Sequence, residues 1–317
     1  MICGVDVSSK TLDARVGRGG PSASFANDGE GIAGLAQFCQ FQGVNLVVME
    51  ATGGYEQQAF ALLWACGLEV AIVNPRSVRK FAQSMGILEK TDQIDCGVIA
   101  WFAEVKKVVA MRPASAQQQR LKALVTRLRQ LTELRAGQRN QRLLVTEATV
   151  QDGFHQLLVF LNQQIRALET EIAALIGADA IWEKLDQSFR SIKGVADRTV
   201  ARLMAEMPEI GTLSNKKISK LAGLAPLADD SGKSQGKRSI YGGRQAVRDI
   251  LYVVAGVVSR HNPDFSAFQT RLAQAGKAKK VIRIALAHKL LVRLNAKARA
   301  VRQQFNTTTP LMATPPR

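Results

Sequence analysis

The stretch MICGVDVSSKTLDARVG, residues 1–17, decides the fold of the N-terminal part of this chain. Its first apolar run, up to Val7, predicts a strand, and the alternation of apolar and polar residues after the SSK turn predicts a second strand. Asp6 lies at the end of the first strand. Further along, NLVVME, residues 45–50, is rich in β-branched residues and predicts a buried strand that ends in Glu50. Two carboxylates are thus expected at strand ends.

A second acidic pair lies in KTDQIDCGVIAWFA, residues 90–103. Thr91–Lys106 is predicted to form a helix, so Asp92 and Asp95, three residues apart, share one of its faces. Taken singly, such residues are more often caps or turn formers, and it is the combination of four carboxylates that favours a site. Gathered carboxylates repel one another unless cations hold them together. Mg²⁺ or Mn²⁺ suits these oxygen ligands, and two such ions roughly 4 Å apart are the usual device for phosphodiester chemistry.

The other elements of this part alternate between strand and helix, which predicts a mixed sheet with helices on its faces. Strands and helices are expected in a fixed order, with strands at 1–7, 13–17, 23–26, 46–50 and 69–73 and helices at 32–41, 56–66 and 91–106. An acidic residue on the first and fourth strands and an acidic pair on the last helix complete the layout of the ribonuclease-H-like nuclease fold. We therefore expect an α/β domain of this class over residues 1–107.

Charge is distributed unevenly along the 317 residues, whose formal net charge is +17. Residues 1–107 carry 9 Lys/Arg and 11 Asp/Glu, residues 108–185 carry 10 and 7, and residues 186–317 carry 24 and 8. The excess of positive charge in the C-terminal third predicts a polyanionic partner, because Lys and Arg neutralise phosphates.

The four cysteines and three histidines are too scattered for a zinc site or a disulfide framework. We interpret the cysteines as buried thiols of a protein in a reducing cytosol. No leader peptide and no membrane span is expected, since no apolar run approaches the roughly 20 residues that a span requires.

The middle of the chain, residues 108–185, predicts long helices. Gln117–Leu144 contains Gly137 as its only helix breaker, and its leucines recur at three- and four-residue spacing. A heptad pattern returns between Leu158 and Leu175. These residues are expected to form a coiled-coil segment, either as a helical hairpin within one chain or as a coiled coil between two chains.

From residue 186 onward the chain is expected to be mainly helical and basic, ending in a disordered tail over residues 306–317. Ile192–Val195 and the helix after it resemble a helix-hairpin-helix element, which would offer backbone N–H groups to a phosphate. An ordinary helical turn is at least as good an interpretation, because the second glycine expected near Ala196 is missing.

Leu227–Gly243 predicts a loop in which glycine and serine alternate with cations. A hydroxyl such as that of Ser231 could act there as a nucleophile, with the cations stabilising phosphoryl oxygens. Tyr241 is an alternative nucleophile in the same loop. The cations expected to contact nucleic acid are Lys233, Lys237, Arg238, Arg244, Lys279, Lys280 and Lys289.

Over nearly its whole length, the chain resembles the DEDD-type transposases of bacterial insertion sequences, described as bridge-RNA-guided recombinases, and related site-specific DNA invertases. The resemblance rests on six blocks in a common order: GVDVSSKTLD, VVMEATGGYE, KTDQIDCGVIA, GVADRTVARLMAEMPEIG, GLAPLADDSGKSQG with RSIYGGRQAVRDILY, and NPDFSAFQTRLAQAGKAKKVIRIALAHKLL. The chain departs from the family at Cys96, where alanine is more usual, at His288, where Arg or Lys often stands, and in QSMGILEK, residues 83–90.

This resemblance implies an N-terminal domain like that of a Holliday-junction resolvase, a coiled-coil middle, and a C-terminal transposase domain over residues 186–305. It implies that Ser231 attacks a DNA phosphate and forms a transient 5′-phosphoserine link. It places the ligands of Mg²⁺ or Mn²⁺ at Asp6, Glu50, Asp92 and Asp95.

The expected partners are double-stranded donor and target DNA, a structured guide RNA, and further copies of the chain in a homodimer or tetramer. The expected location is the bacterial cytoplasm, at the nucleoid. One alternative is a DEDD nuclease or junction resolvase that uses water and makes no covalent link. Another is a non-catalytic nucleic-acid-binding protein, against which the presence of all four carboxylates argues.

Overall fold

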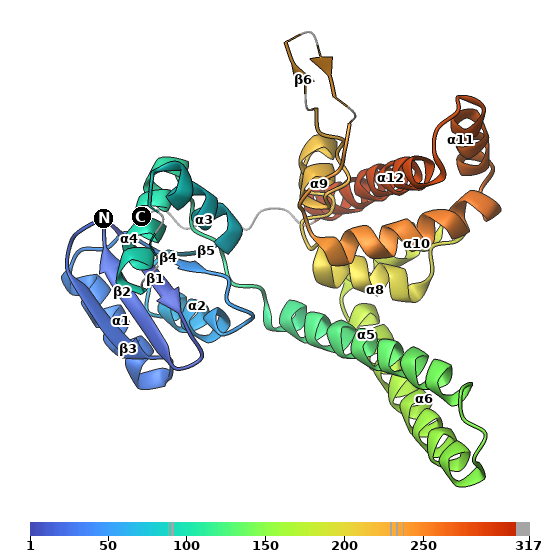
Figure 1. Cartoon of the computed structure of the whole chain (residues 1–317), viewed down its shortest axis with the longest axis horizontal. Coiled ribbons are helices and arrows are strands. Elements are labelled where there is room, and N and C mark those ends of the chain that lie inside the picture. Colours follow the sequence, from blue (N-terminus) through green and yellow to red (C-terminus); the bar gives the residue numbers. More distant parts are fainter. Residues whose placement is uncertain (88, 90–91, 229, 233, 237, 309–317) are drawn as a thin grey trace. The chain divides into compact units, whose positions relative to one another are not determined.

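The computed structural model describes residues 1–87, 89, 92–228, 230–232, 234–236 and 238–308. The chain divides into two compact units, Met1–Ala114 and Ser115–Arg317 (Figure 1), and each unit is described by itself below. Within the described ranges, none of the helices combines the length and the apolar character that crossing a membrane requires.

The first unit is built on a five-stranded mixed sheet with the strand order β3-β2-β1-β4-β5. Strand β1 runs antiparallel to β2 and parallel to β4. The elements are β1 (Ile2–Val7), β2 (Thr11–Val16), β3 (Ser22–Ala26), α1 (Gly29–Phe41), β4 (Leu46–Glu50), α2 (Glu56–Ala65), β5 (Val70–Val73), α3 (Pro75–Ser84) and α4 (Asp92–Lys106). Apart from α3, these are the strands and helices that the sequence predicts for a ribonuclease-H-like domain.

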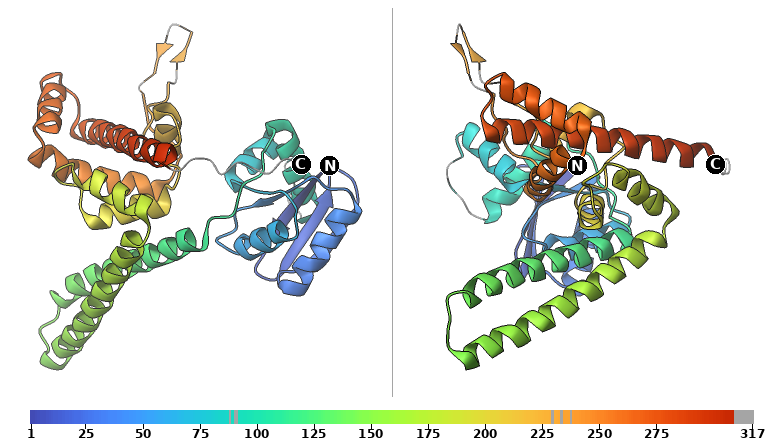
Figure 2. Two further views of the ribbon diagram at one scale, coloured as in Figure 1. Left: turned by 180° about the vertical axis from the view of Figure 1, so that it is seen from behind. Right: turned by 90° about the vertical axis from the view of Figure 1, so that its right-hand side faces the viewer.

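Helices α1 and α2 cover one face of this sheet, and α3 and α4 cover the other (Figure 2). Buried apolar side chains fill the layer on each face. Strand β4 contributes Val47 and Met49 to the first layer and Leu46 and Val48 to the second, as the alternation of side chains along a strand requires. Burial on both faces explains why this strand reads as an uninterrupted apolar run.

Two features of the first unit differ from the expectations. The sequence predicts no helix between the strand at 69–73 and the helix at 91–106, because Asn74-Pro75 is typical of the end of a strand. In the structure, the Asn74 side chain accepts a hydrogen bond from the Arg76 amide at 2.9 Å, and Pro75 takes the first helical position, so the pair begins a helix. The second difference is Cys66, which is exposed, whereas the other three cysteines are buried as expected.

The second unit is almost entirely helical (Figures 1 and 2). Its helices are α5 (Ala116–Arg142), α6 (Ala148–Gly177), α7 (Ala180–Arg190), α8 (Asp197–Glu206), α9 (Asn215–Leu221), α10 (Gln245–His261), α11 (Pro263–Gln274) and α12 (Lys279–Thr308). Two short strands, β6 (Asp230–Ser231) and β7 (Ser234–Gln235), pair within the segment that the sequence predicts as a loop.

Helices α5 and α6 form a long hairpin within one chain. The seam residues Leu121 and Leu128 of α5 and Leu161 and Ile165 of α6 are buried in the same apolar cluster. Of the two alternatives that the heptad pattern leaves open, the hairpin within one chain describes this structure. The leucines that suggest a coiled coil between chains already pack against one another here.

Two further expectations for this unit are revised. The disordered tail predicted over residues 306–317 is wrong for its first three residues, because α12 continues to Thr308, where the Thr307 hydroxyl donates to the carbonyl oxygens of Gln303 and Gln304. Residues 309–317 lie outside the described residues. The turn at Gly194 (φ +98°) packs against α10, since a Cβ there would lie 3.0 Å from Cα of Val258. This close packing favours the ordinary turn over a phosphate-binding element.

Candidate active site

Asp6 and Glu50 lie side by side on neighbouring strands of the first unit. Strands β1 and β4 are parallel, and Val5 lies opposite Met49. Continuing this register by one residue places Asp6 beside Glu50, and neighbours in register point to the same face of a sheet. Both residues are half-buried. The structure therefore brings together the two strand-end carboxylates that the sequence singles out.

Helix α4 approaches the same face at very short range, because Gly4 carries no side chain. Gly4 and Asp6 are two residues apart on β1 and share a face. A Cβ built on Gly4 would lie 2.0 Å from the carbonyl oxygen of Cys96 and 2.7 Å from the amide nitrogen of Ala100. The backbone of α4 thus touches β1 at Gly4, two residues before Asp6 on the same face of the sheet.

The acidic pair of α4 comes just before this contact. Asp95 precedes Cys96 and is half-buried, whereas Asp92 begins the helix and its side chain lies outside the described part of the structure. Among the side chains that are described, no three acidic, His or Cys groups are arranged to hold a metal ion. The donors that Asp6, Glu50 and Asp95 supply are all carboxylate oxygens, so their chemistry fits Mg²⁺ or Mn²⁺.

The negative charge of this face acts on a neighbouring thiol. The Cys96 thiol donates a hydrogen bond to the carbonyl oxygen of Asp13 at 2.8 Å. Burial, reinforced by the charges of Asp6 and Asp13, raises the pKa of Cys96 to about 12. Cys96 therefore stays a neutral thiol at physiological pH and adds no further negative charge to the carboxylates.

The turn after Glu50 is fixed by Glu56, a residue that is not among the predicted site residues. Glu56 is buried, and its Oε2 accepts hydrogen bonds from the amides of Thr52 and Gly54, both at 2.9 Å. Burial alone would favour the protonated acid, but these bonds and one from Gln57 outweigh it and lower the pKa of Glu56. The signal in the sequence is a glutamate two residues after a Gly-Gly pair at the start of a predicted helix.

Ser231 belongs to the second unit, where it lies on an exposed two-stranded ribbon. Asp230 pairs with Gln235 and Ser231 with Ser234, and Gly232 (φ +54°) lies in the turn between them. The ribbon rises from the segment between α9 and α10 (Figure 1), and Ser231 is exposed on it.

Bonds across the base of this ribbon involve the predicted cation Arg238. Its Nη1 donates to Asp230 Oδ1 at 2.7 Å, and the Gly236 amide donates to the same oxygen at 3.2 Å. One step further down, the Leu227 amide donates to the carbonyl oxygen of Ser239 at 2.8 Å. Asp230 is therefore engaged in holding the two strands together beside Ser231.

Arg244, also predicted to contact nucleic acid, is committed to contacts inside the unit. Its two terminal nitrogens bind the carboxylate of Glu209 at 2.6 and 2.5 Å, and Nη1 also donates to the carbonyl oxygen of Glu206 at 2.8 Å. Burial of Glu209 opposes its ionisation, but the bonds from Arg244 prevail and lower the pKa of Glu209. These contacts favour a structural role for Arg244.

The remaining predicted cations are placed differently from one another. Lys289 donates to the carbonyl oxygen of Asp264 at 2.9 Å and lies 4.5 Å from the ring centre of Phe268. Lys279 and Lys280 are exposed at the start of α12. Lys233 and Lys237 lie outside the described residues.

Two family profiles match this sequence, one in each part of the chain. The first, described as a transposase of the DEDD type, matches residues 3–146 and so includes the acidic face. The second, described as the transposase IS116/IS110/IS902 family, matches residues 186–270 and includes Ser231. The fold and the matched segments define a DEDD-type transposase. The chain belongs to the IS116/IS110/IS902 family of transposases.

The chain is also similar to two curated proteins over most of its length. It is 28% identical to the pilin gene-inverting protein of Moraxella lacunata over 308 residues, which are 91% of this chain and 92% of the relative. It is 28% identical to the pilin gene-inverting protein of Moraxella bovis over 302 residues, with the same coverage of the two chains.

Proposed function

We propose that this transposase cuts and rejoins DNA in a metal-dependent reaction that passes through a covalent serine–DNA link. The observation that carries the proposal is the adjacency of Asp6 and Glu50 on parallel strands, against which the first turns of α4 pack. Asp92 and Asp95 would complete the ligand set. Mg²⁺ or Mn²⁺ held there would supply a Lewis acid for the scissile phosphate.

Ser231 would act as the nucleophile in this scheme. Its Oγ forms a bond to phosphorus, the bond from phosphorus to the 3′ oxygen breaks, and the serine proton ends on the departing 3′ oxygen. The product is a 5′-phosphoserine. Attack by the 3′ hydroxyl of a second strand reverses these steps, which joins the strands and frees the serine. Exposure of Ser231 on its ribbon supports the role, because a duplex must reach the hydroxyl.

The similarity to the pilin gene-inverting proteins supports recombination over simple cleavage, since their name describes the inversion of a gene. The alternative is a DEDD nuclease or junction resolvase that uses water in place of serine. The two functions differ in one product, because only the serine route leaves protein attached to a 5′ phosphate.

Trapping that product tests the proposal. With labelled duplex and Mg²⁺, we expect wild-type protein to form a covalent adduct and Ser231→Ala to form none. Ser239→Ala is the matched control, because Ser239 is an exposed serine in the same segment. If Ser231→Ala still cuts and leaves free 5′ phosphates, the water-dependent nuclease is the correct function. A surviving adduct would remove Ser231 from the mechanism and return attention to Tyr241.

The metal site is tested by removing one ligand. Asp92→Asn takes away a charged oxygen donor, so we expect strand cleavage to be lost in Mg²⁺. Binding of DNA should survive, because most of the positive charge lies in residues 186–317. Full cleavage by Asp92→Asn would contradict the assignment.

We further propose a guide RNA and a homodimer or tetramer in which Ser231 of one copy serves the carboxylates of another. The charge of residues 186–317 supports a second polyanion beside DNA. Co-purification of a structured RNA, removed by ribonuclease with loss of recombination, tests the first point. Mixing Ser231→Ala with Asp92→Asn tests the second, since only a shared site restores recombination in the mixture.

A further inference from the structure

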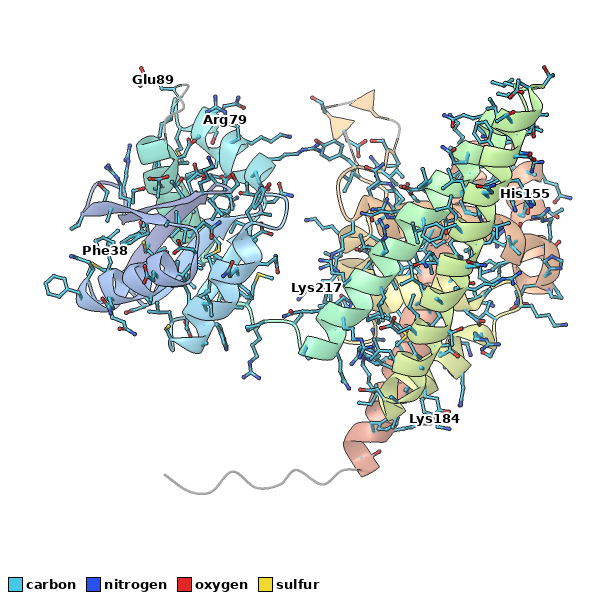
Figure 3. All side chains as sticks on the ribbon, turned by 90° about the horizontal axis from the view of Figure 1, so that it is seen from below. Phe38, Arg79, Glu89, His155, Lys184 and Lys217 are labelled. Carbon is cyan, nitrogen blue, oxygen red and sulfur yellow. The ribbon has the colours of Figure 1, made fainter. Side chains whose placement is uncertain are left out.

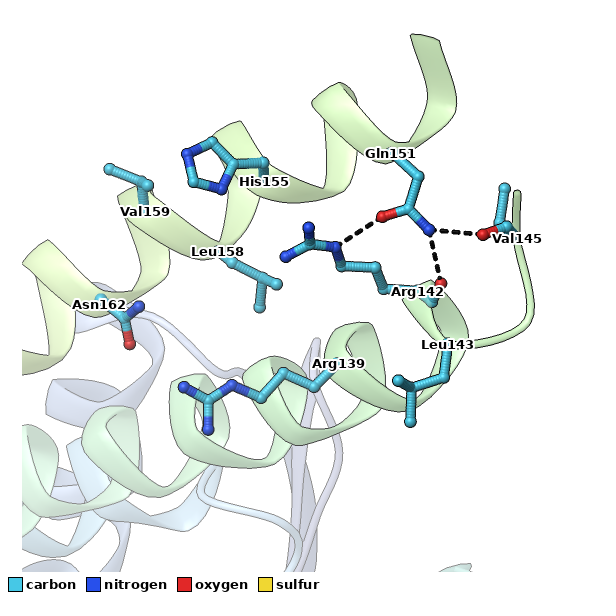
Figure 4. A pocket seen from close by; sticks show the side chains of 9 residues that line it. All are labelled: Arg139, Arg142, Leu143, Val145, Gln151, His155, Leu158, Val159 and Asn162. Atoms are coloured by element: carbon cyan, nitrogen blue, oxygen red, sulfur yellow. Dashed lines mark hydrogen bonds between the residues drawn. The ribbon is translucent and has the colours of Figure 1, made fainter. Parts of the chain in front are cut away.

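The free end of the α5–α6 hairpin contains a pocket that the proposed reaction does not use. It has a volume of about 740 Å³ and lies between the last turns of α5 and the first turns of α6 (Figure 4). His155 marks this end of the hairpin in Figure 3. The lining residues named in Figure 4 include two arginines, one histidine and two side-chain amides, and no acidic residue.

Neutral amides hold the arginines of this region in place. Arg142 Nε donates to Gln151 Oε1 at 2.7 Å, and Gln151 Nε2 donates back to the carbonyl oxygens of Arg142 and Val145. Arg135, one turn before Arg139, donates to Asn162 Oδ1 at 2.9 Å. An amide oxygen orients a guanidinium but, unlike a carboxylate, leaves its positive charge unbalanced.

Carboxylates pair with the arginines of α5 elsewhere on the helix, through the ion pairs Arg120–Glu171 and Arg129–Glu133. In the described part of the chain, the side chain of Arg139 makes no hydrogen bond or ion pair, and neither Arg135 nor Arg142 forms a salt bridge. Burial and the like charge of Arg139 lower the pKa of Arg135. Like charges that face one another disfavour the protonated form in this way, although Glu169, the ion-pair partner of Arg198, opposes the shift.

The acidic residues nearest in sequence do not line the pocket. Glu147 Oε2 accepts a hydrogen bond from the Val150 amide at 2.8 Å and so caps α6. Asp152 is exposed and is absent from the lining. A cation at the end of α5 also complements the helix dipole. The dipole does not account for Arg135 and His155, which lie away from the last turn of α5.

We infer that this pocket binds a phosphate of a nucleic-acid backbone. Arg142 is held in a fixed plane by Gln151, and a fixed guanidinium suits the bidentate binding of phosphate oxygens. Arg139 has its donors available, and Leu158 and Val159 line the pocket with apolar surface that a sugar can cover. The inference rests on the proposed function, that the chain acts on nucleic acid. The pocket would be a nucleic-acid contact on the hairpin, in addition to the contacts predicted for the basic residues beyond 186.

The sharpest test inserts a counter-charge without changing shape. In Asn162→Asp, the residue keeps the oxygen that accepts from Arg135 and gains a negative charge in the lining of the pocket. The full-length variant should melt at the wild-type temperature or above it, yet its affinity for labelled duplex DNA should fall about tenfold at ~0.15 M salt. Gln164→Glu is the control, since it adds the same charge to α6 at an exposed position outside the lining.

A second variant removes a cation. Arg139→Gln should lower the slope of log affinity against log salt by about 0.9 for duplex DNA or about 0.7 for a single strand. Arg127→Gln is the matched control, because Arg127 is an exposed arginine of α5 outside the pocket. Each variant is measured with duplex DNA and with a structured RNA, so that the two sources of phosphate are told apart.

A loss of affinity for duplex DNA or for the structured RNA that occurs in the pocket variants and not in their controls supports the inference. The nucleic acid whose affinity falls is the one that the pocket binds. If wild-type protein binds and cleaves DNA but the pocket variants match their controls with both nucleic acids, the pocket inference is refuted while the proposed function stands. If wild-type protein binds neither DNA nor RNA, the proposed function fails and the pocket inference fails with it.

Discussion

Replacing Gly4 by alanine should push α4 away from the sheet and disable the acidic face. The new Cβ would lie 2.0 Å from a carbonyl oxygen and 2.7 Å from an amide nitrogen of α4. Ordinary contact begins near 3.4 Å, so the helix backbone must retreat by about 1.4 Å. Both obstructing atoms belong to the main chain, so a side-chain rotation gives no relief. We expect a loss of about 1–3 kcal/mol in stability, as for other overpacked sites.

The effect on activity should exceed the effect on stability. A displacement of this size moves Asp92 and Asp95 relative to Asp6 and Glu50, and a misplacement of ~1 Å can cost about a hundredfold in rate. Thermal melting and Mg²⁺-dependent strand cleavage of the full-length variant measure the two effects. Gly29→Ala is the control, because nothing lies within 4 Å of a Cβ at this first residue of α1.

A Gly4→Ala protein that melts like Gly29→Ala and cleaves DNA at the wild-type rate would refute this reasoning. It would mean that α4 can shift without cost and that the placement of the acidic pair does not depend on this contact. Loss of cleavage with unchanged melting would still support the placement argument, because the geometry of the site is stricter than that of the fold.

Two further predictions concern the second unit. Arg244→Gln should cost roughly 1–2 kcal/mol at pH 7, because it leaves the half-buried Glu209 without its partner. Because the pKa of Glu209 is lowered in the folded protein, the ion pair contributes to the free energy of unfolding above the ordinary glutamate pKa of ~4.3. This contribution is lost as the pH falls through the pKa of Glu209 in the folded protein. Urea unfolding should therefore show this acid dependence for the wild-type protein and not for Arg244→Gln. Gly137→Ala should raise the stability of the hairpin by about 0.5–1 kcal/mol in thermal melting, since nothing lies within 4 Å of a Cβ inside α5. A drop in melting temperature for Gly137→Ala would indicate a contact at this position that the chain alone does not make.

The first unit could be predicted from the sequence where local pattern decides. Asp6 and Glu50 were identifiable because each ends an apolar run, and Asp92 and Asp95 because their spacing fits one helix face. The role of Gly4 could not be predicted in this way, since it depends on which helix crosses which strand.

Other features could not be predicted, because a short motif is compatible with two structures or because a contact depends on the folded backbone. Asn74-Pro75 both ends a strand and caps the helix that follows. Glu56 accepts hydrogen bonds from two backbone amides of a turn, and no pattern of side chains in the sequence predicts such bonds. The heptads of the middle segment define the seam but carry no information on whether the partner helix comes from the same chain.

The pairing of α5 with α6 restricts how the hairpin can change in length. A residue inserted into one helix turns all positions beyond it by about 100° and takes the seam out of alignment with the partner. Seam residues return to register after seven residues, and the opposite helix must gain the same seven to meet them. Homologous hairpins should therefore differ in steps of about 10 Å, at 1.5 Å per residue. The length of the hairpin can therefore change only in discrete steps, and both helices must lengthen together.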